Sequence, residues 1–278
     1  MAGAVLQKAL ATQAKGDFAG SARIYRALLS KHSDLLARRT VSGRMITGPD
    51  FLIIGAPRSG TSWLKLRLAE HPAIRIMAGE PHYFSYHATG DPRLYIRSFV
   101  HGSVKNPKLN FPGHRIYGEK SPSYLALSDD RIALAAALFP GVRLICLVRD
   151  PVQRAWSHLK LHGVGHDHRS QTYTEALEAG RYAAGLARWG RHFPASRFLL
   201  LDFDRIRTDP ARVFAETLAH IGAPPLDLDF PPAPDQRRED APAELRTRLE
   251  DVYRGERWDL PYLRDVLETA AAGLSPTA

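Results

Sequence analysis

Residues 51–64, FLIIGAPRSGTSWL, form the stretch that decides the fold. Four apolar residues run without alternation into Gly55, which is typical of a strand buried on both faces of a parallel sheet. Pro57, Gly60 and Thr61 then open a helical pattern, so the stretch predicts a strand, a tight loop and a helix N-terminus. Unpaired N–H groups and the helix dipole attract an anion at such an end. We expect an anion-binding loop, with an ordinary strand-to-helix turn as the alternative.

The spacing within this loop argues against a nucleoside triphosphate bound with magnesium. Gly55 and Gly60 have the separation of the motif G-x-x-x-x-G-K-[ST], but Thr61 stands where that motif has its lysine. The basic side chain comes earlier, at Arg58. The pattern indicates a phosphate loop for a different ligand.

The composition is that of an ordinary globular chain with a positive charge. The 278 residues can form one large α/β domain, alone or with a small appendage. A net charge of +9 predicts an anionic partner: a nucleotide, an acidic polymer, nucleic acid or an anionic membrane surface. No stretch reaches ~18 uninterrupted apolar residues, and the N-terminus lacks a signal-peptide core. With a single cysteine, Cys146, these features predict a cytoplasmic protein without a membrane span.

Residues 1–45 form a region of their own. Apolar residues recur at helical spacing on both sides of Gly16 and Asp17, which predicts a helical pair. The pattern G-D-F-x-x-S-x-x-x-Y-x-x-L resembles a single tetratricopeptide unit, which cannot bury its apolar face alone. We expect the pair to pack on the main domain or in a homodimer; a peptide-binding role is the alternative.

Strand and helix patterns alternate over residues 50–270. Strand patterns occupy residues 51–54, 74–77, 116–117, 143–148 and 198–203. Helical patterns occupy residues 61–70, 129–139, 151–159, 173–193, 210–221 and 242–254. We expect residues 85–115 to be irregular and the chain after 254 to be a soft tail. The alternation predicts an α/β fold in which helices flank a P-loop-like parallel sheet.

Polar residues follow three of the predicted strands, at the sheet edge where ligands gather in such folds. They are the phosphate loop, the Glu119-Lys120 pair, and Arg149 with Ser157 one helix later. A magnesium enzyme would place an aspartate first after a strand, whereas Arg149 has that position here and suits a second phosphate. We expect Asp150 to cap the following helix and Ser157 to add a hydroxyl to the phosphate site.

Several motifs, in order, resemble a known family. APRSGTSWL resembles the 5′-phosphosulfate loop of sulfotransferases that use 3′-phosphoadenosine 5′-phosphosulfate (PAPS), and LVRDPVQRAWS resembles their 3′-phosphate motif. The segments HPAI, GEPHYF, GEKSPSYL and ARWGRHFP are similar to the heparan sulfate branch and its bacterial relatives. The resemblance implies a sulfotransferase fold over residues 50–270. It also implies an enzyme that moves a sulfuryl group from PAPS, without a metal, to a hydroxyl or else an amine of an unidentified carbohydrate or small-molecule acceptor.

The resemblance also implies catalytic roles. Glu80 matches the general base of the heparan branch, and a placed base accelerates such a reaction by roughly 10²–10⁴-fold. Lys120 would stabilise charge on the sulfuryl oxygens, and Arg58 would neutralise the leaving group. His82 would orient the base or the acceptor, and it is the alternative base. The plain alternative for Glu80 is a surface carboxylate before a proline.

The remaining implied roles concern the nucleotide. The residues matched to nucleotide binding are Arg58, Ser59, Gly60, Thr61, Ser62, Trp63, Arg149, Ser157, Arg237 and Arg238. Trp63 would stack on adenine, or else belong to the helix core. Arg237 and Arg238 would return to the 3′-phosphate, or else form a solvated charge run.

Other functions stay open. A P-loop kinase of nucleotides or small molecules is the alternative enzyme, and a scaffold with a degenerate nucleotide site is the alternative without catalysis. Nucleic-acid binding is disfavoured because few aromatic residues lie among the basic ones. His162, His166 and His168 lack the spacing of a known zinc site.

Overall fold

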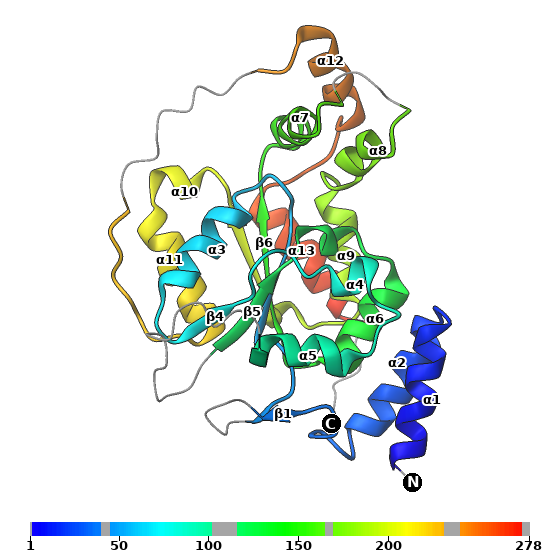
Figure 1. The fold of residues 1–278 in the computed structure, drawn as a ribbon. Helices are drawn as coiled ribbons and strands as arrows, with labels where there is room; N and C mark the ends of the chain where they lie inside the picture. The colour runs from blue at the N-terminus through cyan, green and yellow to red at the C-terminus, as the bar shows by residue number, and fades with distance from the viewer. Residues whose placement is uncertain (1, 40–44, 102–115, 165–168, 231–239, 274–278) are drawn as a thin grey trace.

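The computed structural model describes residues 2–39, 45–101, 116–164, 169–230 and 240–273. Its centre is a five-stranded sheet in the order β4-β5-β3-β6-β7, in which all neighbours are parallel (Figure 1). The strands are β3 (Phe51–Gly55), β4 (Ile74–Ile76), β5 (Ile116–Lys120), β6 (Arg143–Val148) and β7 (Phe198–Asp202). A separate antiparallel pair is formed by β1 (Arg38–Arg39) and β2 (Met45–Ile46). The parallel sheet confirms the predicted α/β fold.

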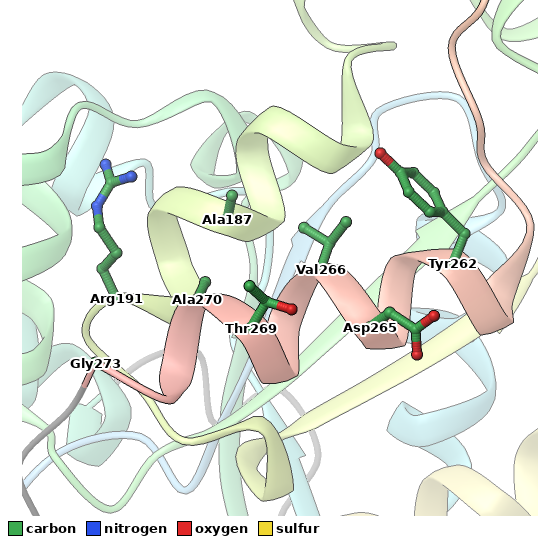
Figure 2. A pocket seen from close by; sticks show the side chains of 8 residues that line it. All are labelled: Ala187, Arg191, Tyr262, Asp265, Val266, Thr269, Ala270 and Gly273. Atoms are coloured by element: carbon green, nitrogen blue, oxygen red, sulfur yellow. The ribbon is translucent and has the colours of Figure 1, made fainter.

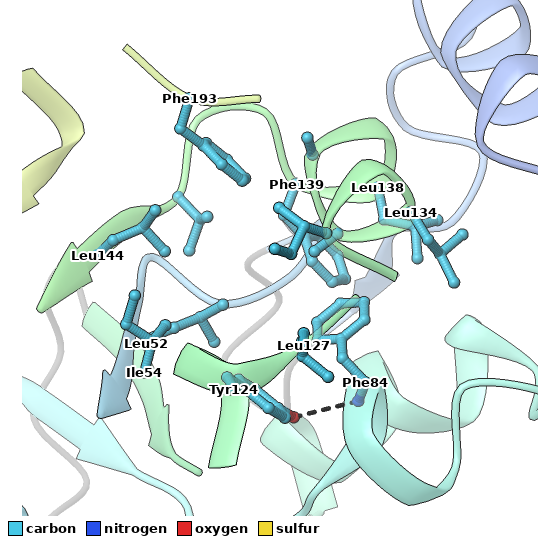
Figure 3. Packing of buried hydrophobic residues seen from close by; sticks show 14 of the residues in the cluster. Leu52, Ile54, Phe84, Tyr124, Leu127, Leu134, Leu138, Phe139, Leu144 and Phe193 are labelled. Atoms are coloured by element: carbon cyan, nitrogen blue, oxygen red, sulfur yellow. Dashed lines mark hydrogen bonds between the residues drawn. The ribbon is translucent and has the colours of Figure 1, made fainter. Parts of the chain in front are cut away.

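The uninterrupted apolar run of β3 supplies both faces of the sheet. Phe51 and Ile53 pack toward one helical layer, and Leu52 and Ile54 toward the other. The first layer comprises α3 (Thr61–Glu70), α10 (Arg205–Thr208) and α11 (Pro210–Ile221) (Figure 1). The second includes α4 (Tyr83–Tyr86), α5 (Pro92–His101), η2 (Pro122–Ala126), α6 (Asp129–Leu138), α9 (Tyr182–Gly190), η3 (Ala195–Arg197) and α13 (Leu260–Ala271). Figure 3 shows the core under this second layer.

A third apolar cluster lies beyond the carboxyl end of β6. It packs together α7 (Pro151–Leu161), α8 (Gln171–Glu178) and α12 (Ala243–Val252). Asp150 caps α7 by accepting a hydrogen bond from the Gln153 N–H at 2.7 Å, and Pro151 takes the first helical position. The predicted role of Asp150 as a cap is confirmed, and the preceding Arg149 is left at the strand end.

The two predicted N-terminal helices are present. They are α1 (Ala2–Ala14) and α2 (Phe18–Leu29). The Asp17 carboxylate accepts from the Gly20 N–H at 2.7 Å and caps α2. Leu6, Phe18 and Tyr25 belong to the same apolar cluster as α6, so the pair packs on the sheet domain (Figure 1).

Three sequence predictions are wrong in the structure. Part of the expected irregular region forms α5, because Tyr95, Ile96 and Phe99 give it one buried face. The expected soft tail contains α13, which Asp259 caps and which packs on α9. The helix expected over 173–193 is two helices, α8 and α9, with Gly180, a residue of low helix propensity, between them against the Tyr253 ring.

Candidate active site

The phosphate loop joins β3 to α3 through Gly60. This residue is the N-cap of α3 and has a left-handed φ of 88°. A Cβ there would contact the side chains of Ile206 and Phe203, so both the conformation and the space require glycine. No side chain in the described part of the chain caps α3. The first N–H groups of the helix are therefore suited to hold an anion.

Arg58 connects the two predicted phosphate motifs. Its Nε donates to the Ser157 hydroxyl at 3.0 Å, and its carbonyl oxygen accepts from Arg149 Nη1 at 3.2 Å. Arg58 is also held at a φ of 68°, a conformation that costs a non-glycine residue roughly 1–3 kcal/mol. Residues from the ends of β3 and β6 thus meet at one point, as the parallel topology predicts.

Packing on two sides orients Arg149. Its guanidinium lies over the Phe203 ring, 4.5 Å from the centroid. Its backbone carbonyl accepts from the Tyr182 hydroxyl at 2.7 Å. The charge of Arg149 is therefore fixed at the carboxyl end of β6, beside the phosphate loop.

Glu80 lies between two other predicted residues. Its Oε1 is 2.5 Å from Lys120 Nζ, and its Oε2 is 3.2 Å from His82 Nε2. Lys120 Nζ also donates to the Ser62 hydroxyl at 3.1 Å. Lys120 is only 5% exposed, so its ammonium is held by these partners and not by bulk water. A buried cation thus links the candidate base to the phosphate loop.

His82 has a fixed position beside this carboxylate. Its φ is 51°, and its backbone N–H donates to the Ser121 hydroxyl at 3.0 Å. Nδ1 lies 3.0 Å from the Ser123 hydroxyl, which is 2.7 Å from the Ser85 hydroxyl. Burial lowers the pKa of His82, with Glu80 acting in the opposite direction. At neutral pH the imidazole is therefore mainly neutral.

Glu119 is a functional candidate that the sequence analysis named only as part of a strand end. It is fully buried and accepts from the Tyr95 and Tyr124 hydroxyls, both at 2.8 Å, and from the Ser121 hydroxyl at 2.7 Å. Burial raises its pKa to about 6, while these hydrogen bonds oppose the rise. Its signal in the sequence is a carboxylate directly before Lys120 inside a strand.

Lys65 was missed as well. It lies one helical turn after Thr61, and its Nζ donates to the Gly79 carbonyl at 2.6 Å. Burial, followed by the charge of Lys120, lowers its pKa. Its signal was the i+4 spacing from Thr61, which places it on the same side of α3.

Other predicted residues are less directly placed. Trp63 is half-buried and packs against Phe230, with 6.0 Å between ring centroids, which fits its alternative as a packing residue. Ser59 and Thr61 are buried, and the Ser59 N–H donates to the Ala56 carbonyl at 3.2 Å. The predicted pair Arg237 and Arg238 lies outside the described residues.

The histidines give no metal site within the described ranges, where no group of three or more metal-ligating side chains is found. His158 and His162 are neighbours, 4.7 Å apart between ring centroids. Burial, and next the charge of Arg154, lower the pKa of His158 to about 4. His166 and His168 lie outside the described part of the chain.

A groove of about 730 Å³ lies elsewhere, between α9 and α13 (Figure 2). Its lining is formed by Ala187, Arg191, Tyr262, Asp265, Val266, Thr269, Ala270 and Gly273. It contains none of the predicted catalytic or nucleotide-binding residues, so we do not assign the chemistry to it.

Comparison with known proteins identifies the family. The model of the sulfotransferase family matches residues 78–227, a segment that contains Glu80, Lys120, Arg149 and Ser157. The chain belongs to the sulfotransferase family. The predicted family, and with it an enzyme, is therefore confirmed.

Relatives of this sulfotransferase include heparan sulfate enzymes. Heparan sulfate glucosamine 3-O-sulfotransferase 3B1 of Mus musculus is 31% identical over 180 residues, covering 59% of this chain and 43% of that protein. The bifunctional heparan sulfate N-deacetylase/N-sulfotransferase 3 of Homo sapiens is 27% identical over 220 residues, covering 70% of this chain and 24% of that protein. The chain thus spans less than half the length of these relatives.

A solved structure supports the same fold. The sulfotransferase from Alicyclobacillus acidocaldarius matches with a TM-score of 0.58 and 22% identity, covering 82% of this chain and 97% of that one. In the portion of the chain described by the structure, no helix has the length and apolar character needed to span a bilayer.

Proposed function

We propose that this sulfotransferase transfers the sulfuryl group of PAPS to an acceptor hydroxyl, with Glu80 as the general base. The observation that carries the proposal is the position of Lys120, which contacts both Glu80 and Ser62 of the phosphate loop. The proposed base Glu80, the buried cation Lys120 and the phosphate loop at Ser62 are thus joined one after the other by direct contacts. This is the order that proton removal, charge stabilisation and departure of a phosphate require.

The donor supplies an activated sulfuryl group on a phosphate that can leave. The acceptor oxygen forms the new S–O bond while its proton passes to a carboxylate oxygen of Glu80. The bond from sulfur to the bridging phosphate oxygen breaks, and its electron pair leaves with adenosine 3′,5′-bisphosphate. Lys120 faces the sulfuryl oxygens and Arg58 the departing phosphate, so each cation meets charge that grows during the transfer.

The nucleotide would be held at both of its phosphate ends. The α3 N-terminus and Arg58 suit the 5′ end, and Arg149 with Ser157 suit the 3′-phosphate. The 3.0 Å contact from the Arg58 side chain to Ser157 and the 3.2 Å contact from Arg149 to the Arg58 carbonyl support a single site for both ends. The planar fork of Arg58 can bind a phosphate with two parallel hydrogen bonds. Transfer without a metal is part of the proposal.

Glu80 is preferred to His82 as the base because its carboxylate contacts Lys120 through one oxygen and His82 through the other. His82 would orient the carboxylate through its 3.2 Å contact. A neutral imidazole can also accept a proton, so His82 stays the alternative base.

For the acceptor we propose a carbohydrate, with a phenol as the second class and an amine as the less favoured nucleophile. The names of the relatives support a carbohydrate. Tyr86 supports a ring-shaped acceptor, because it is 67% exposed and its ring lies 5.0 Å from the His82 ring. A cytoplasmic location and a homodimer through the N-terminal helices stay predictions.

The test compares Glu80→Gln with the unchanged protein, using labelled PAPS and two probes, heparan sulfate and 4-nitrophenol. We expect turnover to fall by roughly 10²–10⁴-fold, because the amide cannot accept the proton. Binding of adenosine 3′,5′-bisphosphate should be retained in a calorimetric titration. Glu70→Gln, on an exposed carboxylate at the end of α3, is the matched control.

Unchanged turnover in Glu80→Gln, with a large loss in His82→Ala, would transfer the role of base to His82. A P-loop kinase, which the family match does not favour, is tested by thermal unfolding. PAPS without magnesium should raise the melting temperature, and ATP with magnesium should not. The opposite result would contradict the proposed donor.

A further inference from the structure

Gln13, on the N-terminal helix α1, is fully buried and bonds mainly to a distant segment. Its Nε2 lies 2.6 Å from the Ala88 carbonyl oxygen, 2.7 Å from the Gly90 carbonyl oxygen and 2.9 Å from the Tyr83 hydroxyl, and these three acceptors share its two hydrogens. Its Oε1 accepts from the Tyr25 hydroxyl of α2 at 2.8 Å. A buried amide that uses both of its ends ties the helical pair to residues 83–90.

A second contact joins the same two regions. The guanidinium of Arg131, on α6, lies over the Phe18 ring of α2, 4.6 Å from its centroid. Arg131 Nη1 donates to the carbonyls of Phe84 and Ser85, each at 2.6 Å. Phe18 is 6% exposed, so it covers a cation that holds the end of α4. The helical pair therefore supports this segment at two separate points.

The supported segment begins with Glu80 and His82. α4 is only four residues long and His82 is left-handed, so local hydrogen bonds alone do not fix this stretch. Its position depends on tertiary contacts. Tyr83 stacks on Tyr95 with 4.4 Å between centroids and 11° between planes, and the Tyr95 hydroxyl bonds to Glu119.

These contacts form a continuous path from α1 to the neighbour of Lys120, through Gln13, Tyr83, Tyr95 and Glu119. The phosphate loop is fixed differently, by β3, α3 and the bond between Arg58 and Ser157. A change at Gln13 should therefore move the base and leave the nucleotide site in place.

We propose that the helical pair, residues 2–29, is a positioning element for the base, and that Gln13 is its positioning residue. The inference rests on the proposed function of Glu80. Gln13 acts through the Ala88 and Gly90 carbonyls and through Tyr83, which keep the segment of residues 80–91 in place, with α4 against α6 and η2. A shift of about 1 Å in a reacting group can cost as much as 10²-fold in rate.

The experiment uses the full chain with Gln13→Ala and Gln13→Glu. The second variant keeps the size and the Tyr25 acceptor but removes the donor to the two carbonyls. We expect kcat, on whichever of heparan sulfate or 4-nitrophenol is the better probe, to fall roughly 10- to 100-fold. The Kd of adenosine 3′,5′-bisphosphate should change by less than about 2-fold, because no phosphate contact is altered.

Leu6→Ala is the matched control, since Leu6 is a buried residue of α1 that packs in the apolar core. It should lower the melting temperature with little effect on kcat. The inference is overturned if the Gln13 variants keep the kcat of the unchanged protein. It is also overturned if Leu6→Ala lowers kcat equally at the same loss of melting temperature, or if bisphosphate affinity falls as much as kcat.

Two further measurements apply if the Gln13 variants do not fold or if no acceptor is found. Tyr25→Phe removes only the hydroxyl that holds Oε1, so it serves if the Gln13 variants do not fold, and a several-fold loss of kcat is expected. Hydrogen exchange of residues 80–91 needs no acceptor, and faster exchange in the Gln13 variants than in Leu6→Ala supports the link. If the unchanged protein sulfates neither probe, the proposed function fails, while the exchange result still decides the structural coupling.

Discussion

The proposed nucleotide side of the site and the proposed base side are built in different ways. The nucleotide side, Arg58–Ser62 with Arg149 and Ser157, consists of strand ends, a helix terminus and partly exposed cations. The base side, Glu80 with His82 and Lys120, depends on buried polar side chains from α1, α5, β5 and η2. Damage to the first should therefore appear in binding, and damage to the second in turnover.

After Glu80→Gln, the largest effect should come from Lys120→Ala. This change removes the cation that we propose for the sulfuryl oxygens and leaves Glu80 without its 2.5 Å partner. We expect kcat to fall roughly 10²–10³-fold, as when one donor to a developing charge is removed. Single-turnover kinetics with labelled PAPS measure it, with Lys8→Ala on α1 as the control. If the affinity for adenosine 3′,5′-bisphosphate falls by as large a factor as kcat, the two sides do not separate binding from turnover.

A smaller effect is expected from Arg149→Ala. A hydrogen bond to a charged group contributes about 1.5–3 kcal/mol, so the Kd of adenosine 3′,5′-bisphosphate should rise roughly 10- to 100-fold. Arg149→Lys should recover part of this loss, because it keeps the charge without the fork. Calorimetric titration measures the Kd, and Arg246→Ala on the exposed face of α12 is the control. Unchanged affinity would remove Arg149 from the nucleotide side.

The smallest effect concerns stability, through Glu119. Its pKa of about 6 in the folded chain lies above the ordinary 4.5, so folding favours the protonated acid. The contribution of Glu119 to the free energy of unfolding is therefore complete below about pH 4.5, and it is lost as the pH rises through 6. The difference between the two values corresponds to about 2 kcal/mol.

Glu119→Gln should lack this component. Relative to the unchanged protein, its free energy of unfolding should improve by about 2 kcal/mol between pH 4 and pH 7, as measured by urea titration. Glu250→Gln, on an exposed carboxylate, should follow the unchanged protein. If the free energy of unfolding varies with pH in the same way for Glu119→Gln and the unchanged protein, the pKa of Glu119 is not raised by folding.

The sequence best predicted the local structure of the proposed nucleotide side, because the interactions that form it are local. The apolar run before Gly55, the glycine at position 60 and the cap at Asp150 each act on residues within a few positions. The parallel sheet followed from the alternation of such segments, and the strand ends then met as the topology requires. The helix α5 was missed because its apolar face is short and the glycine, proline and histidine residues around it obscure the helical periodicity.

The base side could be named only through resemblance, because its contacts join residues far apart in the chain. Nothing near Gln13 in the sequence predicts that its amide meets the Ala88 and Gly90 carbonyls. The role of Glu119 likewise depends on the hydroxyls of three other residues, Tyr95, Ser121 and Tyr124. Such partners are set by packing, which a pattern of residue types does not specify.

The central place of β3 also bears on how the chain reaches its fold during synthesis. Leu52 pairs with Glu119 on one side and with Leu144 on the other. Both partners leave the ribosome long after β3 itself, and pairings between such distant segments are slow to form. The strand that ends in the phosphate loop must therefore wait for β5 and β6, and the N-terminal helical pair likewise buries its apolar face only once α6 has been made. Although it is encoded early, the anion site can be completed only after the chain has been synthesised through β6.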